Sequence, residues 1–180
     1  MNIIITILLA LVCFIALLLL IALFTRKNYA VQRYIVVDTS SQKAFDYLKH
    51  LKNQDHFNKW VMVDPDMKKT FTGTDGTAGF IYGWNGNKRA GEGEQEIKAI
   101  TEEKSIETEI RFVRPFPGVA QANFYIDAVA DNQTKITWSN VSKMSYPMNI
   151  MLPMIEKMLA KDMDESLVML KSKLSVSSQQ

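Results

Sequence analysis

Hydrophobic residues fill the first part of the chain without interruption and become periodic only afterwards. Residues 3–24 carry no charge, and their one hydroxyl side chain is Thr6. A bilayer core of about 30 Å needs roughly 20 helical residues to cross, so this run is long enough for a transmembrane helix. A cleaved signal peptide is disfavoured, because its apolar core is usually about 7–15 residues long and follows a basic segment. The sequence therefore predicts a membrane anchor over residues 1–25.

Basic residues lie on only one side of the apolar run. Arg26 and Lys27 follow it directly and Arg33 comes a little later, whereas no basic side chain precedes it. Positively charged flanks stay on the cytoplasmic side of a membrane. We therefore expect a single-pass protein whose body faces the cytoplasm. Residues 26–30 form a predicted linker, in which Tyr29 is either an interfacial aromatic residue or an ordinary linker residue.

From residue 31 the pattern changes to that of a folded domain. Residues 31–37, VQRYIVV, alternate and are rich in β-branched side chains, which predicts a strand. Apolar residues then recur at helical spacing over residues 44–51, behind several candidate N-cap residues at 38–41. A second short helix is expected over residues 54–60, with Trp60 as a core residue at its end.

Six further strand-like segments follow, separated by turn signals: 67–74, 78–84, 91–101, 105–113, 120–130 and 134–142. Connections this short favour antiparallel neighbours. The last segment, 147–174, predicts a helix whose apolar stripe is Met151, Ile155, Leu159, Met163, Leu167, Leu170 and Leu174. Pro153 should lie near the helix start, because an interior proline breaks a helix. Residues 175–180 form a polar tail.

The stretch GWNGNKRAGEGEQEIKAI, residues 83–100, has three possible interpretations: a phosphate-binding loop, an acid/base site or a hairpin. A phosphate loop requires a helix directly after its glycines, but an alternating strand follows Gly93. Asn85-Gly86 between two strand patterns instead predicts a tight hairpin turn with positive φ at both positions. The hairpin interpretation is therefore favoured.

The strand after this turn has two distinct faces. Glu92, Glu94 and Glu96 alternate, so they share one face, and carboxylates without partners favour a face that meets water. The opposite, inner face then carries Gly91, Gly93, Gln95, Ile97 and Ala99. Small residues on an inner face predict room for another group beside the strand.

Composition narrows the chemistry. The net charge is +2 and the longest basic cluster is Arg26-Lys27, which argues against nucleic-acid binding. A single cysteine, Cys13, excludes an intrachain disulfide and fits a reducing compartment. The two histidines, His50 and His56, are six positions apart and do not converge on one ion at helical spacing. We expect neither a metal site nor a cofactor.

The predicted order of elements resembles that of the START-like (SRPBCC) superfamily, which includes polyketide cyclase/dehydrase and lipid-transport proteins. Three stretches carry the similarity: VVDTSSQKAFDYLKHLKNQDHFNKW, YGWNGNKRAGEGEQEI and TKITWSNVS. It covers about residues 29–174 and implies an α+β helix-grip domain over 31–174. In that fold an antiparallel sheet of about seven strands curls around a long C-terminal helix. The N-terminal transmembrane helix is an addition that many members lack.

The resemblance also implies an apolar cavity between sheet and helix, in which members bind lipids, sterols, polyketides or plant hormones. Some members catalyse cyclisation or dehydration. The matching inner positions here are Phe80, Tyr82, Trp84, Gln95, Ile97, Ile110, Phe112, Phe124, Ile126, Trp138, Asn140, Met151, Ile155 and Met158. For each of them, simple packing in the core is the alternative.

The expected polar groups inside are Tyr82, Gln95, Asn140 and Thr108, without a carboxylate or histidine. Acid–base catalysis needs such a titratable group, so binding of a hydrophobic small molecule or lipid is favoured over chemistry. A polyketide cyclase/dehydrase-like enzyme and a membrane-tethered adaptor without ligand are the alternatives. Arg111 and Arg114 flank a PFPG turn, either as solvated charges or as an anion contact at the cavity mouth. No feature specifies the ligand, a protein partner or an oligomeric state.

Overall fold

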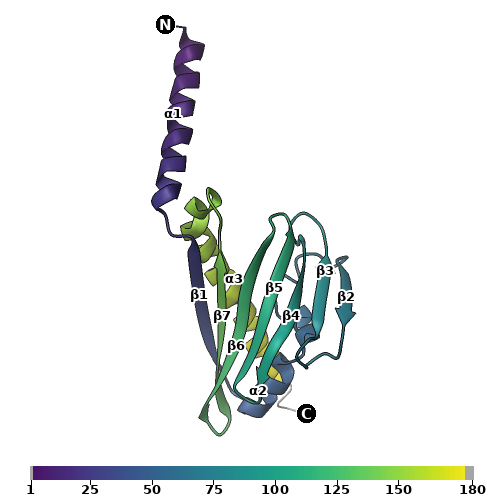
Figure 1. Ribbon diagram of the computed structural model, residues 1–180. Helices are drawn as coiled ribbons and strands as arrows, with labels where there is room; N and C mark the ends of the chain where they lie inside the picture. Colours follow the sequence, from purple (N-terminus) through teal and green to yellow (C-terminus); the bar gives the residue numbers. More distant parts are fainter. Residues whose placement is uncertain (1, 177–180) are drawn as a thin grey trace.

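An antiparallel sheet forms the body of the protein. The computed structural model describes residues 2–176, and within them the sheet has seven strands in the order β1-β7-β6-β5-β4-β3-β2 (Figure 1). The strands are β1 Asn28–Val37, β2 Lys68–Thr72, β3 Ile81–Asn85, β4 Glu92–Thr101, β5 Ser105–Arg114, β6 Gly118–Ala130 and β7 Gln133–Lys143. Strands β2 to β7 form a meander, and β1 joins its far edge beside β7.

The helices complete the fold predicted from the sequence. Two short ones, α2 (Ser41–Leu48) and η1 (Leu51–His56), follow β1, and η2 (Met148–Met151) leads into the long α3 (Leu152–Val176). Pro153 is the second residue of α3, as expected. The α+β helix-grip architecture is therefore confirmed. The predicted polar tail begins inside α3, and its residues 177–180 lie outside the described residues.

The core lies between the sheet and α3. Met163, Leu167, Leu170 and Leu174, from the predicted apolar stripe, are buried there beside residues of β1, α2, β6 and β7. Burying a side chain of this size contributes about 1.5–3 kcal/mol. A second, smaller cluster lies beneath β3 and β4 and consists of Leu51, Phe80, Tyr82 and Ile97. The interior is therefore packed as two separate groups.

The hairpin between β3 and β4 differs from its prediction. Asn85 pairs with Glu92, so the connection is a loop over residues 86–91 rather than a two-residue turn. Positive φ occurs at Gly91 (+68°) and not at Asn85 or Gly86. The side chain of Asn87 organises the loop, because its Oδ1 accepts the N–H groups of Arg89 (2.8 Å) and Ala90 (3.2 Å). These side-chain bonds replace the tight turn.

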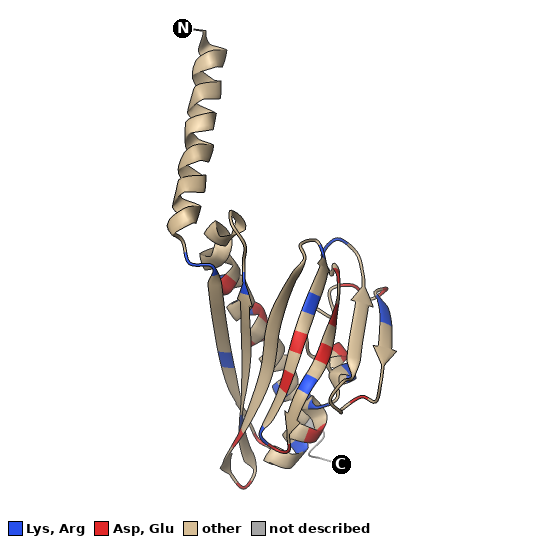
Figure 2. Ribbon diagram, in the orientation of Figure 1, with Lys and Arg blue, Asp and Glu red and all other residues tan. Residues whose placement is uncertain are grey.

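A β-bulge in β4 changes the side of the sheet to which the following side chains point. Ile97 pairs with Thr108 but Ala99 pairs with Glu107, so Lys98 is an extra residue. Ala99 is consequently exposed, and Ile100 packs inward instead. Before the bulge the alternation is as predicted, with Gln95 and Ile97 buried and the glutamates on the outer face. Figure 2 shows acidic and basic residues on the neighbouring strands β4 and β5.

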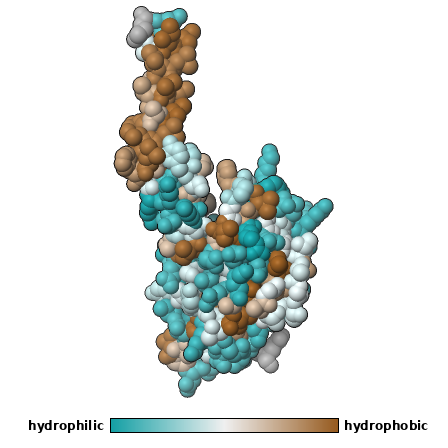
Figure 3. All heavy atoms as spheres, viewed as in Figure 1, coloured by the Kyte–Doolittle hydropathy of each residue, from teal (hydrophilic) through white to brown (hydrophobic). Residues whose placement is uncertain are grey.

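The N-terminal helix α1 (Ile3–Phe24) projects away from one end of the sheet. Its 22 residues are long and apolar enough to cross a membrane by length and composition. Figure 3 shows a hydrophobic surface along its length. Ala22 is its one buried residue among those described. β1 begins at Asn28, three positions earlier than predicted, so strand pairing takes up most of the expected linker.

Candidate functional site

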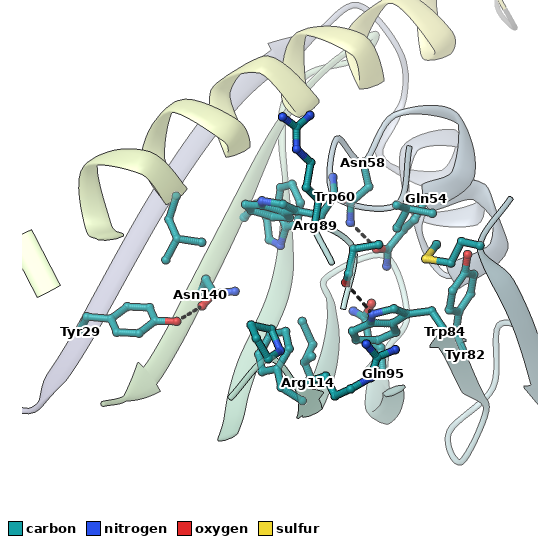
Figure 4. A pocket seen from close by; sticks show the side chains of 18 residues that line it. Tyr29, Gln54, Asn58, Trp60, Tyr82, Trp84, Arg89, Gln95, Arg114 and Asn140 are labelled. Atoms are coloured by element: carbon teal, nitrogen blue, oxygen red, sulfur yellow. Dashed lines mark hydrogen bonds between the residues drawn. The ribbon is translucent and has the colours of Figure 1, made fainter. Parts of the chain in front are cut away.

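A partly enclosed cavity of about 260 Å³ is lined by residues of both hydrophobic clusters, including Trp138 and Tyr82 (Figure 4). The inner faces of β1, β3, β4, β5 and β7 form one wall, and the segment between η1 and β2, with one residue of α3, forms the other. The lining residues are Tyr29, Gln54, Asn58, Trp60, Val61, Met67, Tyr82, Trp84, Arg89, Ala90, Gln95, Ile110, Phe112, Arg114, Pro115, Trp138, Asn140 and Leu159.

Half of the residues suggested by the sequence come together around this cavity. These are Tyr82, Trp84, Gln95, Ile110, Phe112, Trp138 and Asn140. Phe80, Ile97, Phe124 and Ile126 are instead packed within the two hydrophobic clusters. From the last helical region, Met151, Ile155 and Met158 do not line the cavity, and Met158 is 53% exposed. Leu159 provides the contact from α3.

Tyr29 is a cavity residue rather than a linker residue. It lies on β1, and its O–H donates to Oδ1 of Asn140 on β7 over 3.2 Å. Burial raises the pKa of this phenol. The amide nitrogen of Asn140 has no hydrogen-bond partner among the described residues, so it can donate to a guest. Figure 4 shows that nitrogen turned away from Tyr29.

Gln95 offers the complementary group. The Thr108 hydroxyl, which is fully buried, donates to the carbonyl of Ala122 and therefore accepts from Nε2 of Gln95, 2.8 Å away. This order fixes the orientation of the Gln95 amide. Its Oε1 has no hydrogen-bond partner among the described residues. The cavity thus presents a free acceptor at Gln95 and a free donor at Asn140. Nε2 of Gln54 and Nε1 of Trp138, from two other lining residues, are also donors without a partner among the described residues.

The hydroxyl group of Tyr82 donates its hydrogen bond within the protein, so it is not available to donate to a guest. Its O–H donates to Oδ1 of Asp55 over 2.6 Å, and Nζ of Lys69 binds the other carboxylate oxygen at 2.8 Å. Burial, together with this hydrogen bond, strongly raises the pKa of Tyr82. The phenol is therefore protonated at neutral pH and acts as a fixed donor to Asp55 rather than as a base.

Trp60 both packs in the core and lines the cavity. Its ring meets Trp138 edge-on at 5.6 Å, and its Nε1 donates to Asp162 of α3 over 3.2 Å. This bond ties the segment after η1 to the helix. The expected core role is present, and the same side chain forms part of the cavity wall.

The two arginines beside the PFPG turn have different positions. Arg111 lies on the outer face, where it binds Glu94, Glu96 and Glu109 at 2.7 Å each. Arg114 lines the cavity mouth together with Arg89 of the 86–91 loop. Arg114 is paired with Glu92 at 2.8 Å, whereas Arg89 has no ion pair within residues 2–176. Arg89 is therefore the cation available at the mouth.

Several lining residues had no sequence signal for the site. Gln54, Asn58, Val61 and Met67 come from η1 and the irregular segment after it, while Ala90 and Pro115 come from loops. Such segments lack the periodicity that marks inner positions. Among the described residues, no group of three or more His, Cys, Asp or Glu side chains is placed to hold a metal ion.

Comparison with known proteins supports the fold. No protein-family profile matches the sequence, and no curated protein matches it. Among solved structures, norcoclaurine synthase from Thalictrum flavum in complex with dopamine and hydroxybenzaldehyde has a TM-score of 0.60 at 12% identity, covering 86% of this chain and 91% of that chain. An Arthrobacter aurescens protein scores 0.58 at 17% identity, covering 81% and 86%. Ara h 8.0201 scores 0.55 at 13% identity, covering 83% and 99%.

These similarities define the class of fold. The chain has the START/Bet v1-like helix-grip fold, with an additional N-terminal helix. At such low identity the solved structures carry over no ligand or activity. The function has to be argued from the cavity itself.

Proposed function

We propose that this protein is a membrane-anchored START-like domain that binds a hydrophobic small molecule or lipid in the cavity between sheet and α3. Helix α1 is the anchor, and residues 31–174 form the binding domain. The observation that carries the proposal is the cavity, whose walls are largely aromatic and aliphatic but include the free polar atoms of Gln95 and Asn140. Apolar pockets with a few orienting polar groups are typical of small-molecule sites.

Binding is favoured over catalysis because of what lines the cavity. Its described lining contains no histidine, aspartate or glutamate. The one nearby carboxylate, Asp55, is bonded to Tyr82 and Lys69. A general base needs a free lone pair within reach of its substrate. The complex of norcoclaurine synthase with two small aromatic molecules supports the view that this fold can enclose such guests.

The cavity size and its polar atoms suggest the kind of guest. Drug-sized ligands usually occupy about 300–1,000 Å³, so the cavity of about 260 Å³ suits one acyl chain or a small ring system. A hydroxyl group of the guest can donate to Oε1 of Gln95, and a hydroxyl or carbonyl oxygen of the guest can accept from the amide of Asn140. The proposed ligand is therefore an amphiphile with an apolar body and at least one hydroxyl or carbonyl group.

The test compares two tryptophan substitutions on the same helix. Leu159→Trp places a large ring in the cavity, while Val168→Trp changes an α3 residue that is 63% exposed and outside the lining. The full chain is purified in detergent and titrated with a fluorescent fatty acid and a small hydroxyl-bearing aromatic fluorophore. We expect Leu159→Trp to reduce binding at least about tenfold, because the indole takes up space in which the guest would bury its apolar surface. Val168→Trp should retain binding.

Native mass spectrometry of the unmodified protein provides the second readout. A co-purified apolar molecule that is absent from Leu159→Trp supports the proposal. If the unmodified chain binds neither probe and carries no such molecule, the binding proposal is wrong and the adaptor alternative gains support. Equal loss of binding in both variants would also argue against the cavity as the site.

A further inference from the structure

The cavity mouth and α1 lie at the same end of the sheet. Strand pairing places Asn28 opposite Lys143 and Glu92 opposite Arg114. The start of β1, the 86–91 and 115–117 loops and the connection from β7 to α3 therefore share one end, which we call the anchor end. In Figure 1 these loops reach the level of the base of α1.

Helix α1 is fastened to the domain rather than loosely tethered. Asn149 of η2 is fully buried, and its Nδ2 donates to the backbone oxygens of Ala22 at 2.7 Å and Thr25 at 2.9 Å. Arg26 adds an ion pair with Glu156 of α3. The last turn of α1 is thus held by the first turns of the C-terminal helical region. The direction of α1 consequently fixes which end of the domain approaches a membrane.

Apolar side chains are exposed at the anchor end. Phe116, between Pro115 and Pro117 at the tip of the β5–β6 loop, is 66% exposed. Tyr146 and Met148, in the connection from β7 to α3, are 42% and 37% exposed. An exposed phenylalanine at a loop tip gains nothing from water, whereas an aromatic residue in a bilayer interface buries its ring.

Unpaired positive charge surrounds these apolar side chains. The basic residues at the anchor end that have no ion pair within residues 2–176 are Lys27, Lys68, Lys88, Arg89 and Lys143. Of the acidic groups nearby, Glu92 binds Arg114 and Glu156 binds Arg26. The buried Asp64 accepts the N–H of Asn87, and the exposed Asp66 has no ion pair among the described residues. The unpaired basic residues still outnumber these two aspartates. A basic rim around apolar tips matches a bilayer surface that contains anionic lipid.

We propose that the anchor end rests on the bilayer that α1 spans, with Phe116 and Met148 at the boundary between headgroups and acyl chains. The cavity mouth, lined by Arg89, Arg114 and Pro115, then opens directly onto the membrane surface. This inference rests on the proposed anchoring by α1. It assigns the partner of the surface as an anionic phospholipid bilayer, from which a guest enters the cavity without crossing bulk water.

Fluorescence quenching on the full-length protein tests the geometry. In a Cys13→Ala background, single cysteines are introduced by Leu11→Cys, Phe116→Cys, Met148→Cys and Asn132→Cys and labelled with bimane. Position 132 lies in the β6–β7 turn at the opposite end of the sheet and serves as the control. The protein is reconstituted in phosphatidylcholine–phosphatidylserine vesicles that contain lipids with a nitroxide either near the headgroup or near the acyl-chain end.

We expect the label at position 11 to be quenched by the deep nitroxide, and the labels at 116 and 148 by the shallow one. Quenching at 116 and 148 should exceed that at 132 by about twofold or more, because interfacial side chains lie within about 5–10 Å of the headgroup boundary. If position 11 is quenched but 116 and 148 match 132, α1 is inserted and the inference is wrong. If position 11 is not quenched, both the anchor proposal and this inference fail.

Discussion

Gly93 shows how closely the inner face of β4 is packed. A Cβ atom at this position would lie 2.6 Å from the carbonyl oxygen of Arg111 and 2.7 Å from a ring carbon of Trp84. Gly93→Val should therefore lower the free energy of unfolding by about 2–3 kcal/mol, as overpacking does. Chemical denaturation of the full chain in detergent measures the loss.

Glu94→Gln is the matched control on the neighbouring, outward position. Glu94 is one of three partners of Arg111 and is partly exposed, so we expect a change below about 1 kcal/mol. Similar losses in both variants would show that the two faces of β4 have been assigned incorrectly.

Gln95 is expected to distinguish polar from purely apolar guests. Gln95→Leu removes the free Oε1 while Thr108 keeps its bond to Ala122. Affinity for a monoacylglycerol should fall about fivefold to tenfold, in line with about 1 kcal/mol for one hydrogen bond. Affinity for an aliphatic hydrocarbon probe should change little. Gln121→Leu, on the exposed face of β6, is the control, and equal effects from both would rule out the assigned contact.

The three small residues expected to leave space for a guest, Gly91, Gly93 and Ala99, do not do so. Gly93 packs against Trp84 and the carbonyl of Arg111. Gly91 is needed for its positive φ, and a side chain there would meet the carbonyl of Arg114. Ala99 follows the bulge and faces solvent. Strand alternation predicts which side of the sheet a side chain points to only where the strand is regular. Nothing in the residues around Lys98 indicates the β-bulge. Leu159→Trp therefore fills the cavity more directly than substitutions at Gly91 or Ala99.

Between β4 and β5, a charge cluster makes stability depend on pH. Hydrogen bonds from Arg111 lower the pKa of Glu96 and Glu109 below their usual range. A lowered pKa in the folded state means that the stabilisation is complete above the ordinary glutamate value of about 4.3 and is lost as pH falls through the lowered value.

Arg111→Gln should therefore reduce the melting temperature by a few degrees at neutral pH. The difference from the unmodified protein should disappear at pH values where both carboxylates are protonated. Thermal melts at a series of pH values give this difference directly. A deficit that stayed constant down to strongly acidic pH would mean that Arg111 acts through packing rather than charge.

The junction between α1 and η2 depends on one amide. Asn149→Ala leaves the carbonyls of Ala22 and Thr25 without their donor, so α1 should be freed from its fixed direction. Tryptic cleavage after Arg26 and Lys27 should become several-fold faster in the reconstituted protein. Asn53→Ala removes the same kind of bond, from Nδ2 of Asn53 to the carbonyl of Tyr47, at the opposite side of the fold and should leave this cleavage unchanged. Unchanged cleavage in Asn149→Ala would show that the junction does not depend on this residue.

At the level of elements, the sequence predicts strands and helices well and the cavity only in part. Period-two alternation defines inner positions such as Tyr82, Gln95 and Trp138, and all three line the cavity. The opposite wall comes from an irregular segment, where Asn58 and Val61 take their places through hydrogen bonds to Gln54 and packing on the small cluster. These tertiary contacts have no counterpart in local periodicity.

For the whole molecule, the order of elements is sufficient to specify the fold. Short connections after each strand allow little besides an antiparallel meander, and the apolar stripe from Met163 to Leu174 requires a sheet to cover it. The contact between α1 and the domain, in contrast, cannot be predicted from the order of elements. It arises from Asn149, 127 positions away from Ala22 in sequence, and such a contact is visible only in the folded structure.

The final prediction concerns the association of the full chain with a membrane through α1. Exposing the side chains of α1 to water would be unfavourable, whereas a 22-residue uncharged helix can span a hydrocarbon core of about 30 Å. Membrane association should therefore resist carbonate extraction and be lost when residues 1–24 are deleted. Because Arg26 and Lys27 should remain on the cytoplasmic side, external protease should spare the domain in intact cells and degrade it in inverted membrane vesicles. Degradation in intact cells together with protection in the vesicles would show that the domain faces the opposite side of the membrane. Extraction of the full chain by carbonate would show that α1 does not anchor the protein.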